Sequence, residues 1–330
     1  MVDIERRTKE LLRVRHRRTS KLFVGVDGGG TKTHAVVVDD SDRVLGEGTT
    51  GPSNPLRVGV TSAAGAIREA VDRACNMAQV RKSDIVAAEV GLAGTRRQEL
   101  RARMEDALTN LDIREIEVVG DADIALFGAT GGESGVVVIA GTGSISCGIN
   151  ARGKRVCAGG WGPVAGDEGG GAWIARRGLR AIAQATDGRG PETTLTAAAC
   201  SYFHVSTADD LSTAIYAPTI TNERIAGFAR QVIEAARAKD RVARSIMVEA
   251  GTELGIAAAA VIRNLKMEGE RFQVAYVGGV FAAGELLLEA LRGEVARIAP
   301  RAFLAPPRYP PAVAAARMAR EHPNRVALAV

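Results

Sequence analysis

The sequence predicts an α/β fold made of two similar lobes. Short apolar segments typical of strands alternate with helical stripes along the 330 residues. A pattern of two apolar strands joined by a glycine turn opens the first lobe and recurs near residue 136. No Ser/Pro-rich linker separates the halves, so the lobes are expected to touch along a cleft.

The first lobe is predicted to open with a β-meander over residues 22–26, 33–39 and 44–48, with turns of Gly and Asp between the strands. Apolar residues then recur at helical spacing from Val60 to Ala78. Two further buried strands, at 85–90 and 116–119, flank a charged helix at 96–109.

The second lobe repeats this opening. It is predicted to contain strands at 136–140, 144–149, 154–158 and 272–277 and helices at 168–185, 224–238, 242–265 and 284–298. We therefore expect a basic extension over residues 1–21, a first domain over 22–125 and a second over 126–330.

The charge of the chain is concentrated at its start. Residues 1–21 carry eight Lys/Arg against three acids, which accounts for the whole net charge of +5 and leaves a neutral body. A neutral body argues against a nucleic-acid-binding surface. The sequence contains no run of eighteen apolar residues, so no membrane span is predicted. The basic segment lacks the apolar core of a secretory signal, so we expect a solvated extension of a cytoplasmic protein.

The four cysteines, Cys75, Cys147, Cys157 and Cys200, have no metal-ligand spacing. Cys147 and Cys157 could face each other across a hairpin, but the expected state is buried and reduced.

The first glycine turn, Asp27-Gly28-Gly29-Gly30-Thr31-Lys32-Thr33, is predicted to bind phosphate. It is not a P-loop, because a strand rather than a helix follows and Lys32 comes after Thr. Its glycines allow positive φ and close approach of backbone N–H groups to phosphate oxygens. Asp27 is suited to hold Mg²⁺ through water, whereas a purely structural hairpin would need fewer glycines.

Two later turns support this interpretation through repetition. Gly141-Thr142-Gly143-Ser144 occupies the corresponding position in the second lobe, and Gly278-Gly279 ends a further apolar strand. Each is a weak signal alone, since such turns are common. Together they predict a nucleotide site.

Asp121 directly follows the apolar strand at 116–119, at a carboxyl end where open sheets place ligands. A carboxylate there could accept the proton of an attacking alcohol. The structural alternative is a helix N-cap for residues 122–130, and Asp123 competes for either role.

A glycine-rich run over residues 159–169 suggests a sugar site. Glycines on both sides let the backbone approach a ligand, and Asp167 offers two acceptor oxygens for vicinal hydroxyls. The alternatives are a core Trp161 and an Asp167 that caps the following helix.

These motifs resemble the BadF/BadG/BcrA/BcrD-type ATPase-domain family and, within it, the N-acetylglucosamine kinases of the actin, Hsp70 and sugar kinase superfamily. Two further segments carry the resemblance, residues 51–55 and 225–228, and it extends from about Leu22 to Met318. It implies two ribonuclease-H-like (actin-like ATPase) domains around a nucleotide- and sugar-binding cleft, ATP with Mg²⁺, a small sugar substrate and a homodimer.

The resemblance also assigns roles to residues. It implies that Thr31 and Thr142 contact phosphates, that Ala226 and Gly278 contact the adenosine, and that Asp121 is the general base. It places at the sugar Asn54, Ser144, Gly160, Trp161, Gly162 and Asp167, together with Asp121 itself. One departure is Ile145, where the animal acetamido-sugar kinases have Asn, and it leaves the choice of sugar open.

The expected function is an ATP-dependent amino-sugar kinase acting on the 6-hydroxyl of N-acetylglucosamine or of a relative such as glucosamine or N-acetylmuramic acid. The alternative is an ATPase activator of the 2-hydroxyacyl-CoA dehydratase or benzoyl-CoA reductase type. Its iron–sulfur chemistry needs cysteines on a dimer-facing loop, and none of the four cysteines of this chain is arranged in that way. A sugar-sensing repressor would need an N-terminal helix-turn-helix longer than 21 residues.

Overall fold

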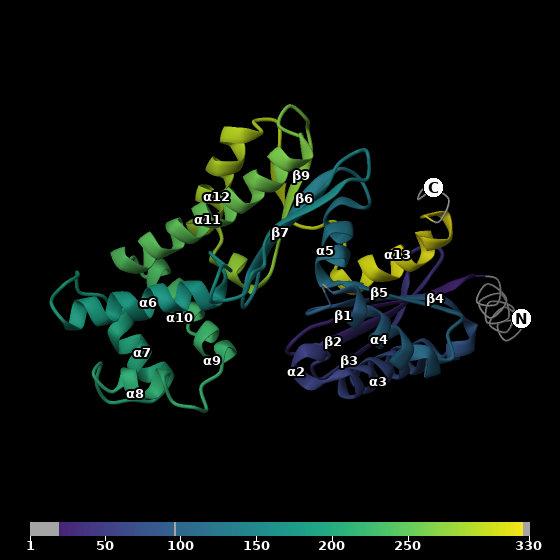
Figure 1. Ribbon diagram of the computed structural model, residues 1–330, viewed down its shortest axis with the longest axis horizontal. Helices are drawn as coiled ribbons and strands as arrows, with labels where there is room; N and C mark the ends of the chain where they lie inside the picture. The colour runs from purple at the N-terminus through teal and green to yellow at the C-terminus, as the bar shows by residue number, and fades with distance from the viewer. Residues whose placement is uncertain (1–19, 96, 326–330) are drawn as a thin grey trace, which may run out of the picture. The chain divides into compact units, whose positions relative to one another are not determined.

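The computed structural model describes residues 20–95 and 97–325 and divides the chain into two units (Figure 1). Unit 1 runs to Gly131 and resumes at Tyr309, and unit 2 comprises Gly132–Arg308. The predicted basic extension lies outside the described residues, except for Ser20 and Lys21.

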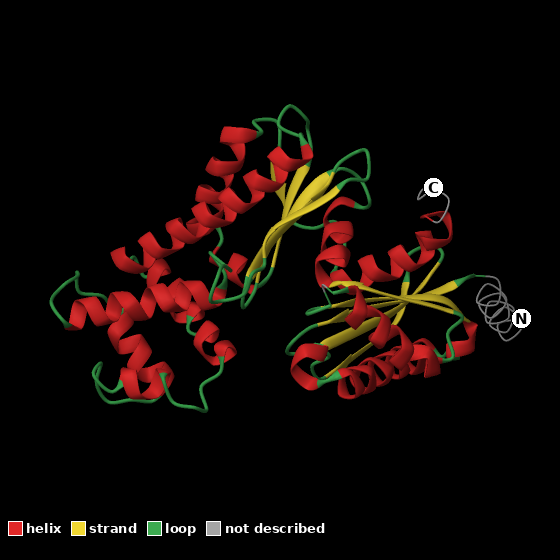
Figure 2. Cartoon of the chain, in the orientation of Figure 1, coloured by secondary structure: helices red, strands yellow, loops and turns green. Residues whose placement is uncertain are grey.

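Unit 1 is built on a five-stranded mixed sheet with the order β3-β2-β1-β4-β5 (Figure 2). Its strands are β1 (Leu22–Gly28), β2 (Thr33–Asp39), β3 (Val44–Thr50), β4 (Ile85–Leu92) and β5 (Glu115–Gly120). The first three form an antiparallel meander, as predicted, while β4 and β5 run parallel to β1.

Helices cover both faces of this sheet. They are α2 (Pro55–Val58), α3 (Val60–Ala78), α4 (Gln98–Leu108), α5 (Asp121–Thr130) and α13 (Pro311–Arg325), with 3₁₀ turns η1 (Lys82–Asp84) and η2 (Thr109–Leu111). Alternation along β1 directs Leu22, Val24 and Val26 to the core shared with α3. Phe23 belongs to a separate cluster with the alanines of α13 on the opposite face.

The structure corrects the predicted domain boundaries. Helix α5 stays with unit 1, so that unit's first segment ends at Gly131 rather than at residue 125, and α13 also belongs to unit 1. The physical reason is packing: Ala314, Ala315 and Met318 of α13 are buried against Ile124 and Phe127 of α5.

Unit 2 repeats the sheet of unit 1. Its strands are β6 (Gly135–Ala140), β7 (Ser144–Ile149), β8 (Arg155–Gly159), β9 (Gln273–Val277) and β10 (Phe303–Ala305). β6, β7 and β8 form the antiparallel meander, and β9 and β10 run parallel to β6 in the order β10-β9-β6-β7-β8. The predicted repetition of the opening pattern is confirmed.

The helices of unit 2 are α6 (Gly171–Thr186), α7 (Leu195–Phe203), α8 (Leu211–Ile215), α9 (Asn222–Gly227), α10 (Ala229–Arg237), α11 (Arg241–Leu265) and α12 (Glu285–Ile298), with the 3₁₀ turn η3 (Gly279–Ala283). The single helix predicted over 224–238 is two helices that meet at Phe228. Helix α6 begins three residues later than predicted, because Asp167 and Gly169 adopt positive φ.

Among the described residues, one helix, α11, is long and apolar enough to cross a membrane by length and composition. Its most apolar window is 56% buried within the protein, and α11 contributes much of the core of unit 2. This burial is typical of a core helix.

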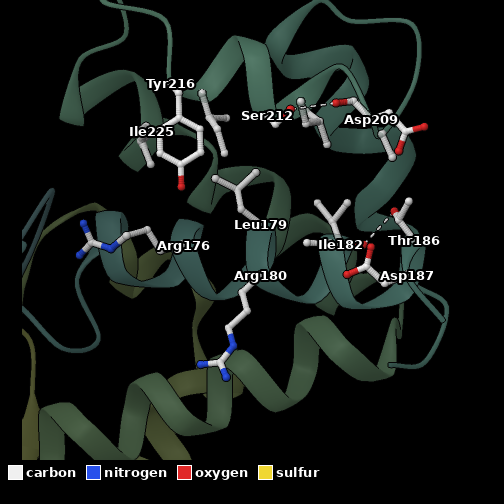
Figure 3. Close-up of a pocket in the computed structure, with 14 residues that line it drawn as sticks. Arg176, Leu179, Arg180, Ile182, Thr186, Asp187, Asp209, Ser212, Tyr216 and Ile225 are labelled. Carbon is white, nitrogen blue, oxygen red and sulfur yellow. Dashed lines mark hydrogen bonds between the residues drawn. The ribbon is translucent and has the colours of Figure 1, made fainter. Parts of the chain in front are cut away.

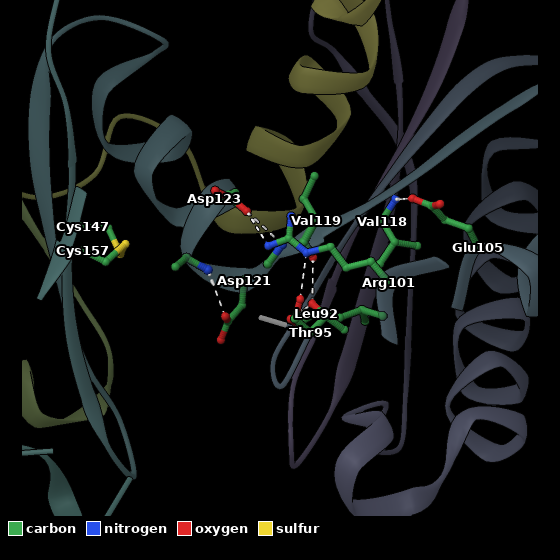
Figure 4. A network of polar contacts seen from close by, with 12 residues as sticks. Leu92, Thr95, Arg101, Glu105, Val118, Val119, Asp121, Asp123, Cys147 and Cys157 are labelled. Carbon is green, nitrogen blue, oxygen red and sulfur yellow. Dashed lines mark hydrogen bonds and ion pairs between the residues drawn. A yellow bond between two sulfur atoms is a disulfide. The ribbon is translucent and has the colours of Figure 1, made fainter. Parts of the chain in front are cut away.

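The prediction of reduced thiols is wrong for one pair. Cys147 and Cys157 face each other directly in the β7–β8 register, with Cα atoms 4.1 Å apart, and form a disulfide (Figure 4). Cys75 and Cys200 are free, and burial raises the pKa of the Cys75 thiol to about 11.

We expect the disulfide to stabilise unit 2. Cross-linking residues ten apart in sequence restricts the unfolded chain and contributes about 2–3 kcal/mol. Protein purified in air and then denatured should show two reactive thiols, and reduction should expose four and lower the melting temperature. Cys200→Ser serves as the control, because its melting temperature should fall equally on reduction. Four reactive thiols before reduction would contradict the assignment.

Candidate active site

The predicted phosphate turn of unit 1 joins β1 to β2. The Gly29 N–H donates to the Lys32 carbonyl at 2.9 Å and closes the turn, while Thr31 and Lys32 are exposed. An ideal Cβ on Gly28 would lie 2.3 Å from Ser53 Oγ and 2.4 Å from Leu92 Cδ2. Gly28 is therefore required for close packing, while the side chains of Thr31 and Lys32 are accessible from solvent.

A second loop is attached to this turn. The N–H groups of Ser53 and Asn54 both donate to the Gly29 carbonyl, at 3.0 and 3.1 Å. Asn54 also caps α2, since its Oδ1 accepts from the Leu56 N–H at 3.0 Å. The residue predicted to contact sugar thus lies beside the phosphate turn, although its carboxamide has a structural role as well.

Asp121 is the first residue of α5, and its exposed side chain follows the carboxyl end of β5. Its Oδ1 accepts from the Ala122 N–H at 2.9 Å. The capping role falls to Asp123, whose Oδ2 accepts from the Gly120 N–H at 3.0 Å (Figure 4). Asp123 therefore caps the helix, and Asp121 keeps one carboxylate oxygen for other partners.

Arg101 of α4 ties this helix start to the end of β4. Its guanidinium lies 3.4 Å from Asp123 Oδ2 and donates through Nε to the Thr95 carbonyl at 2.7 Å. Thr95 Oγ1 in turn lies within hydrogen-bond distance of the Leu92 and Val119 carbonyls. The network holds the ends of β4 and β5 together, and sequence reasoning missed it because its members are dispersed along the chain.

Two carboxyl groups of unit 1 have raised pKa values. Loss of solvation by surrounding protein raises the pKa of Asp27, and the negative charge of Asp121 raises it further. The side chain of Asp121 reaches solvent, but the protein around it still weakens the solvation of its carboxylate and so raises its pKa, with an added contribution from Asp123. Perturbed carboxyl groups of this kind gather at functional sites.

Unit 2 carries the second turn, between β6 and β7. Its carbonyl groups point at the start of α6: the Gly171 N–H donates to the Gly141 carbonyl at 2.8 Å, and the Ala172 N–H donates to the Thr142 carbonyl at 2.9 Å. Thr142 itself is exposed, so its hydroxyl is available to a ligand.

The glycine-rich run of residues 159–169 packs against this turn. A Cβ on Gly143 would lie 2.2 Å from Asp167 Oδ2. Ser144 Oγ donates to the Glu168 carbonyl at 2.7 Å, and the Gly162 N–H donates to Asp167 Oδ1 at 3.2 Å. The predicted sugar residues Ser144, Gly162 and Asp167 are thus brought together, and with them Gly160, whose N–H donates to the Ser144 carbonyl at 3.0 Å.

Asp167 is buried and has a φ of 60°. Burial raises the pKa of its carboxyl, while the N–H groups of Gly162 and Ser144 and the charge of Arg176 lower it. Trp161 is 71% exposed, so it is not the core residue that the structural alternative required. An exposed Trp beside glycines with positive φ could stack on the apolar face of a ring.

The predicted adenosine residues lie at the same end of this sheet. A Cβ on Gly278, at the end of β9, would lie 2.2 Å from the Ala140 carbonyl oxygen, and a Cβ on Gly171 would lie 3.4 Å from that of Ala226. Gly279 opens η3. Ala226, Gly278 and the turn at Gly141 therefore gather around the carboxyl ends of β6 and β9.

The predicted site residues form one group in each unit. In unit 1 they are Asp27, Gly28, Gly29, Gly30, Thr31, Lys32, Asn54 and Asp121, and in unit 2 Gly141, Thr142, Gly143, Ser144, Gly160, Trp161, Gly162, Asp167, Ala226, Gly278 and Gly279. Arg57 of α2 also lies beside the first glycine turn, since its guanidinium would be 3.1 Å from a Cβ on Gly30. Arg57 was not singled out from the sequence, and only its position three residues after Asn54 could have indicated that it lies near this turn.

Two α/β units with the same five-stranded mixed sheet, each with a glycine-rich turn after its first strand, define a chain of the actin-like ATPase class. The sequence matches the BadF/BadG/BcrA/BcrD ATPase family over residues 24–319, and the chain belongs to that family.

Characterised relatives within this class are sugar kinases. The N-acetylmuramic acid/N-acetylglucosamine kinase of Clostridium acetobutylicum is 33% identical over 261 residues, 79% of this chain and 85% of the relative. The N-acetyl-D-glucosamine kinase of Dictyostelium discoideum is 31% identical over 91% of this chain and 98% of the relative. A solved structure from Chromobacterium violaceum, described as a candidate N-acetylglucosamine kinase, has a TM-score of 0.75 and 27% identity over 90% of this chain and 98% of its own.

Proposed function

We propose that this chain is an ATP-dependent amino-sugar kinase that transfers the γ-phosphoryl group to the 6-hydroxyl of N-acetylglucosamine or a close relative such as glucosamine or N-acetylmuramic acid. The main support is its 31–33% identity to curated kinases of N-acetylglucosamine and N-acetylmuramic acid over most of the chain. The Gly143–Asp167 contact, which joins a phosphate-type turn to a carboxylate suited to sugar hydroxyls, supports the same function.

In this proposal the residues divide the work of phosphoryl transfer. The N–H groups of Gly29 and Gly141 close the two glycine turns. Other backbone N–H groups of these turns, with Thr31, Lys32 and Thr142, bind phosphates. Asp167, Ser144 and Asn54 orient the sugar, and Asp121 accepts the proton of the attacking hydroxyl. Exclusion of water from the bound ligands would favour attack by the sugar hydroxyl over hydrolysis.

Magnesium fits the donor set on unit 1. Loss of solvation, and after it the like charge of Asp121, raise the pKa of Asp27, and a divalent cation would offset the repulsion between the two carboxylates. Asp27 would hold the ion through water, and the ion would neutralise charge on the phosphates.

We further propose a cytoplasmic homodimer that binds neither nucleic acid nor membrane. The neutral charge of residues 22–330 supports the absence of a nucleic-acid partner. Sedimentation at several protein concentrations tests the dimer.

The test of function is ADP release with and without sugar. We expect slow release from ATP alone and a rise of about tenfold or more with N-acetylglucosamine or another amino sugar, because closure on the acceptor aligns the hydroxyl. A panel of hexoses and amino sugars, with the phosphosugar identified by mass spectrometry, defines the substrate.

An ATPase activator would instead hydrolyse ATP without sugar. Equal ADP release with and without the whole panel, and no phosphosugar, would overturn the kinase proposal. The cysteines of unit 2 argue against the activator, since Cys147 and Cys157 are paired with each other and only Cys200 of this unit remains free for a cluster.

A further inference from the structure

Unit 2 contains a cavity of about 580 Å³ that none of the predicted site residues lines (Figure 3). It lies between α6 on one side and α8 with the start of α9 on the other. Its walls are mostly apolar and include Leu179, Ile182, Leu211, Ile215, Tyr216 and Ile225. Cavities of this size and lining are typical of small-molecule sites.

One wall carries an available positive charge. Arg176 of α6 lines the cavity and is half-buried, and it forms no ion pair with any residue that the structure describes. Its neighbour Arg177 pairs with Glu249 instead. At the opposite end Asp187 pairs with Arg189. Arg180 of α6 also lines the cavity, but its guanidinium points away from it (Figure 3), so Arg176 is the cation of α6 that we assign to a ligand.

Tyr216 completes the cavity. Its side chain is 83% exposed, yet its ring stands over the apolar floor with the hydroxyl directed toward α6 (Figure 3). An exposed aromatic ring beside an apolar hollow offers a stacking surface for a ring or a chain.

We propose that this cavity is a regulatory site for a small organic anion with an aromatic or aliphatic body, whose anionic group pairs with Arg176 and whose occupation weakens sugar binding. The body would cover the apolar floor beneath Tyr216, and the anionic group gives a charged hydrogen bond that orients it. The binding itself does not depend on the proposed kinase activity, whereas the effect on sugar does.

Two structural links join the cavity to the candidate site. Ile225 lines the cavity, and the next residue, Ala226, packs against Gly171 at the start of α6, which bonds the turn at Gly141. In addition, the charge of Arg176 lowers the pKa of the Asp167 carboxyl. An anion that neutralises Arg176 removes this support and disfavours the carboxylate that would hold sugar hydroxyls.

The probe is 8-anilinonaphthalene-1-sulfonate, an aromatic anion, titrated into the full-length protein at saturating ATP analogue. We expect saturable one-to-one fluorescence. Arg176→Met keeps the aliphatic stem and should weaken binding about tenfold, as loss of a charged hydrogen bond does. Arg180→Met is the matched control, because in Figure 3 this guanidinium points away from the cavity, and it also lines a separate groove beside α11.

A second variant tests the cavity by filling it. Ser212 on α8 lines the cavity and is exposed, so Ser212→Trp should abolish probe binding without unfolding the protein, as checked by circular dichroism. Non-saturable fluorescence, displacement of the probe by nucleotide, or equal affinity in the folded Ser212→Trp protein would overturn the site. Loss of self-association in Ser212→Trp would make the cavity an interface between copies and would also overturn it.

Coupling is measured separately. The probe should raise the KM for the sugar about threefold or more in the wild type and leave it unchanged in Arg176→Met. An unchanged KM in the wild type would overturn the regulatory role. If no sugar is phosphorylated at all, the proposed function fails, while the fluorescence titration still decides whether the cavity binds anions.

Discussion

Asp121→Asn is expected to lower kcat by about 10²–10⁴ while ATP still binds. Asparagine keeps the size of the side chain and can still accept the Ala122 N–H bond that orients Asp121, but it cannot take a proton from the attacking hydroxyl. Steady-state kinetics of ADP release and nucleotide titration together separate the loss of chemistry from a loss of binding.

Asp123→Asn is the matched comparison, because Asp123 lies two residues after Asp121 in the same first turn of α5. Its carboxylate accepts from the Gly120 N–H and lies beside Arg101, so its loss should cost about 1 kcal/mol of stability, as loss of a cap does. We expect kcat to stay within about tenfold of the wild type. A larger kinetic loss for Asp123→Asn than for Asp121→Asn, in a folded protein, would refute the assignment of the base.

The pH dependence of stability gives an independent check on Asp121. Its pKa is raised in the folded protein, so the folded state holds the proton more tightly than the unfolded chain does. Stability therefore falls as pH rises from the unfolded pKa through the folded one, and the ionised carboxylate is destabilising at neutral pH. Asp121→Asn should keep or slightly raise the melting temperature at pH 7 while it abolishes the acidic limb of the activity profile.

The elements that could be predicted from sequence are those with a strong local signal. The apolar stripe of α3 gave its bounds, Val60–Ala78, and the glycine turns after β1 and β6 were evident from composition. The break between α9 and α10 was not, because the apolar spacing continues through Phe228, which is itself buried. Periodicity reports which face is buried, but not where the backbone changes direction.

Long-range pairing was the part that no local pattern contained. Sequence could not decide whether Cys147 and Cys157 are joined, since that depends on the hairpin register that sets them opposite each other. It likewise gave no sign that Arg101 would reach Thr95 and Asp123. The packing of α13 on the first sheet is the largest feature of this kind that the sequence did not predict. Gly25 of β1 is the one residue whose type reflects it, because it lies against the backbone of α13.

Gly25→Ala is expected to destabilise unit 1 by about 3 kcal/mol, because the new methyl group would overpack a closed contact. A Cβ at Gly25, in the middle of β1, would lie 2.0 Å from the Ala312 carbonyl oxygen and 2.2 Å from the Ala316 nitrogen. Both are backbone atoms of α13, so no change of rotamer relieves the clash, and the helix must move off the sheet. Denaturant unfolding and limited proteolysis near residue 309 measure the effect.

Gly65→Ala in α3 is the control for Gly25→Ala. Apart from its chain neighbours and the backbone of α3 itself, no atom lies within 4 Å of the position that its new methyl group would take. Alanine is also the better helix former, so this variant should gain about 0.5–1 kcal/mol. Equal stability changes in the two variants would contradict the close packing of α13 on β1. Activity should fall together with stability in Gly25→Ala and stay unchanged in Gly65→Ala, because α13 also packs on α5, the helix that begins with Asp121. A displaced α13 therefore loosens the candidate base, and kcat of the folded fraction should fall more than the KM for ATP changes.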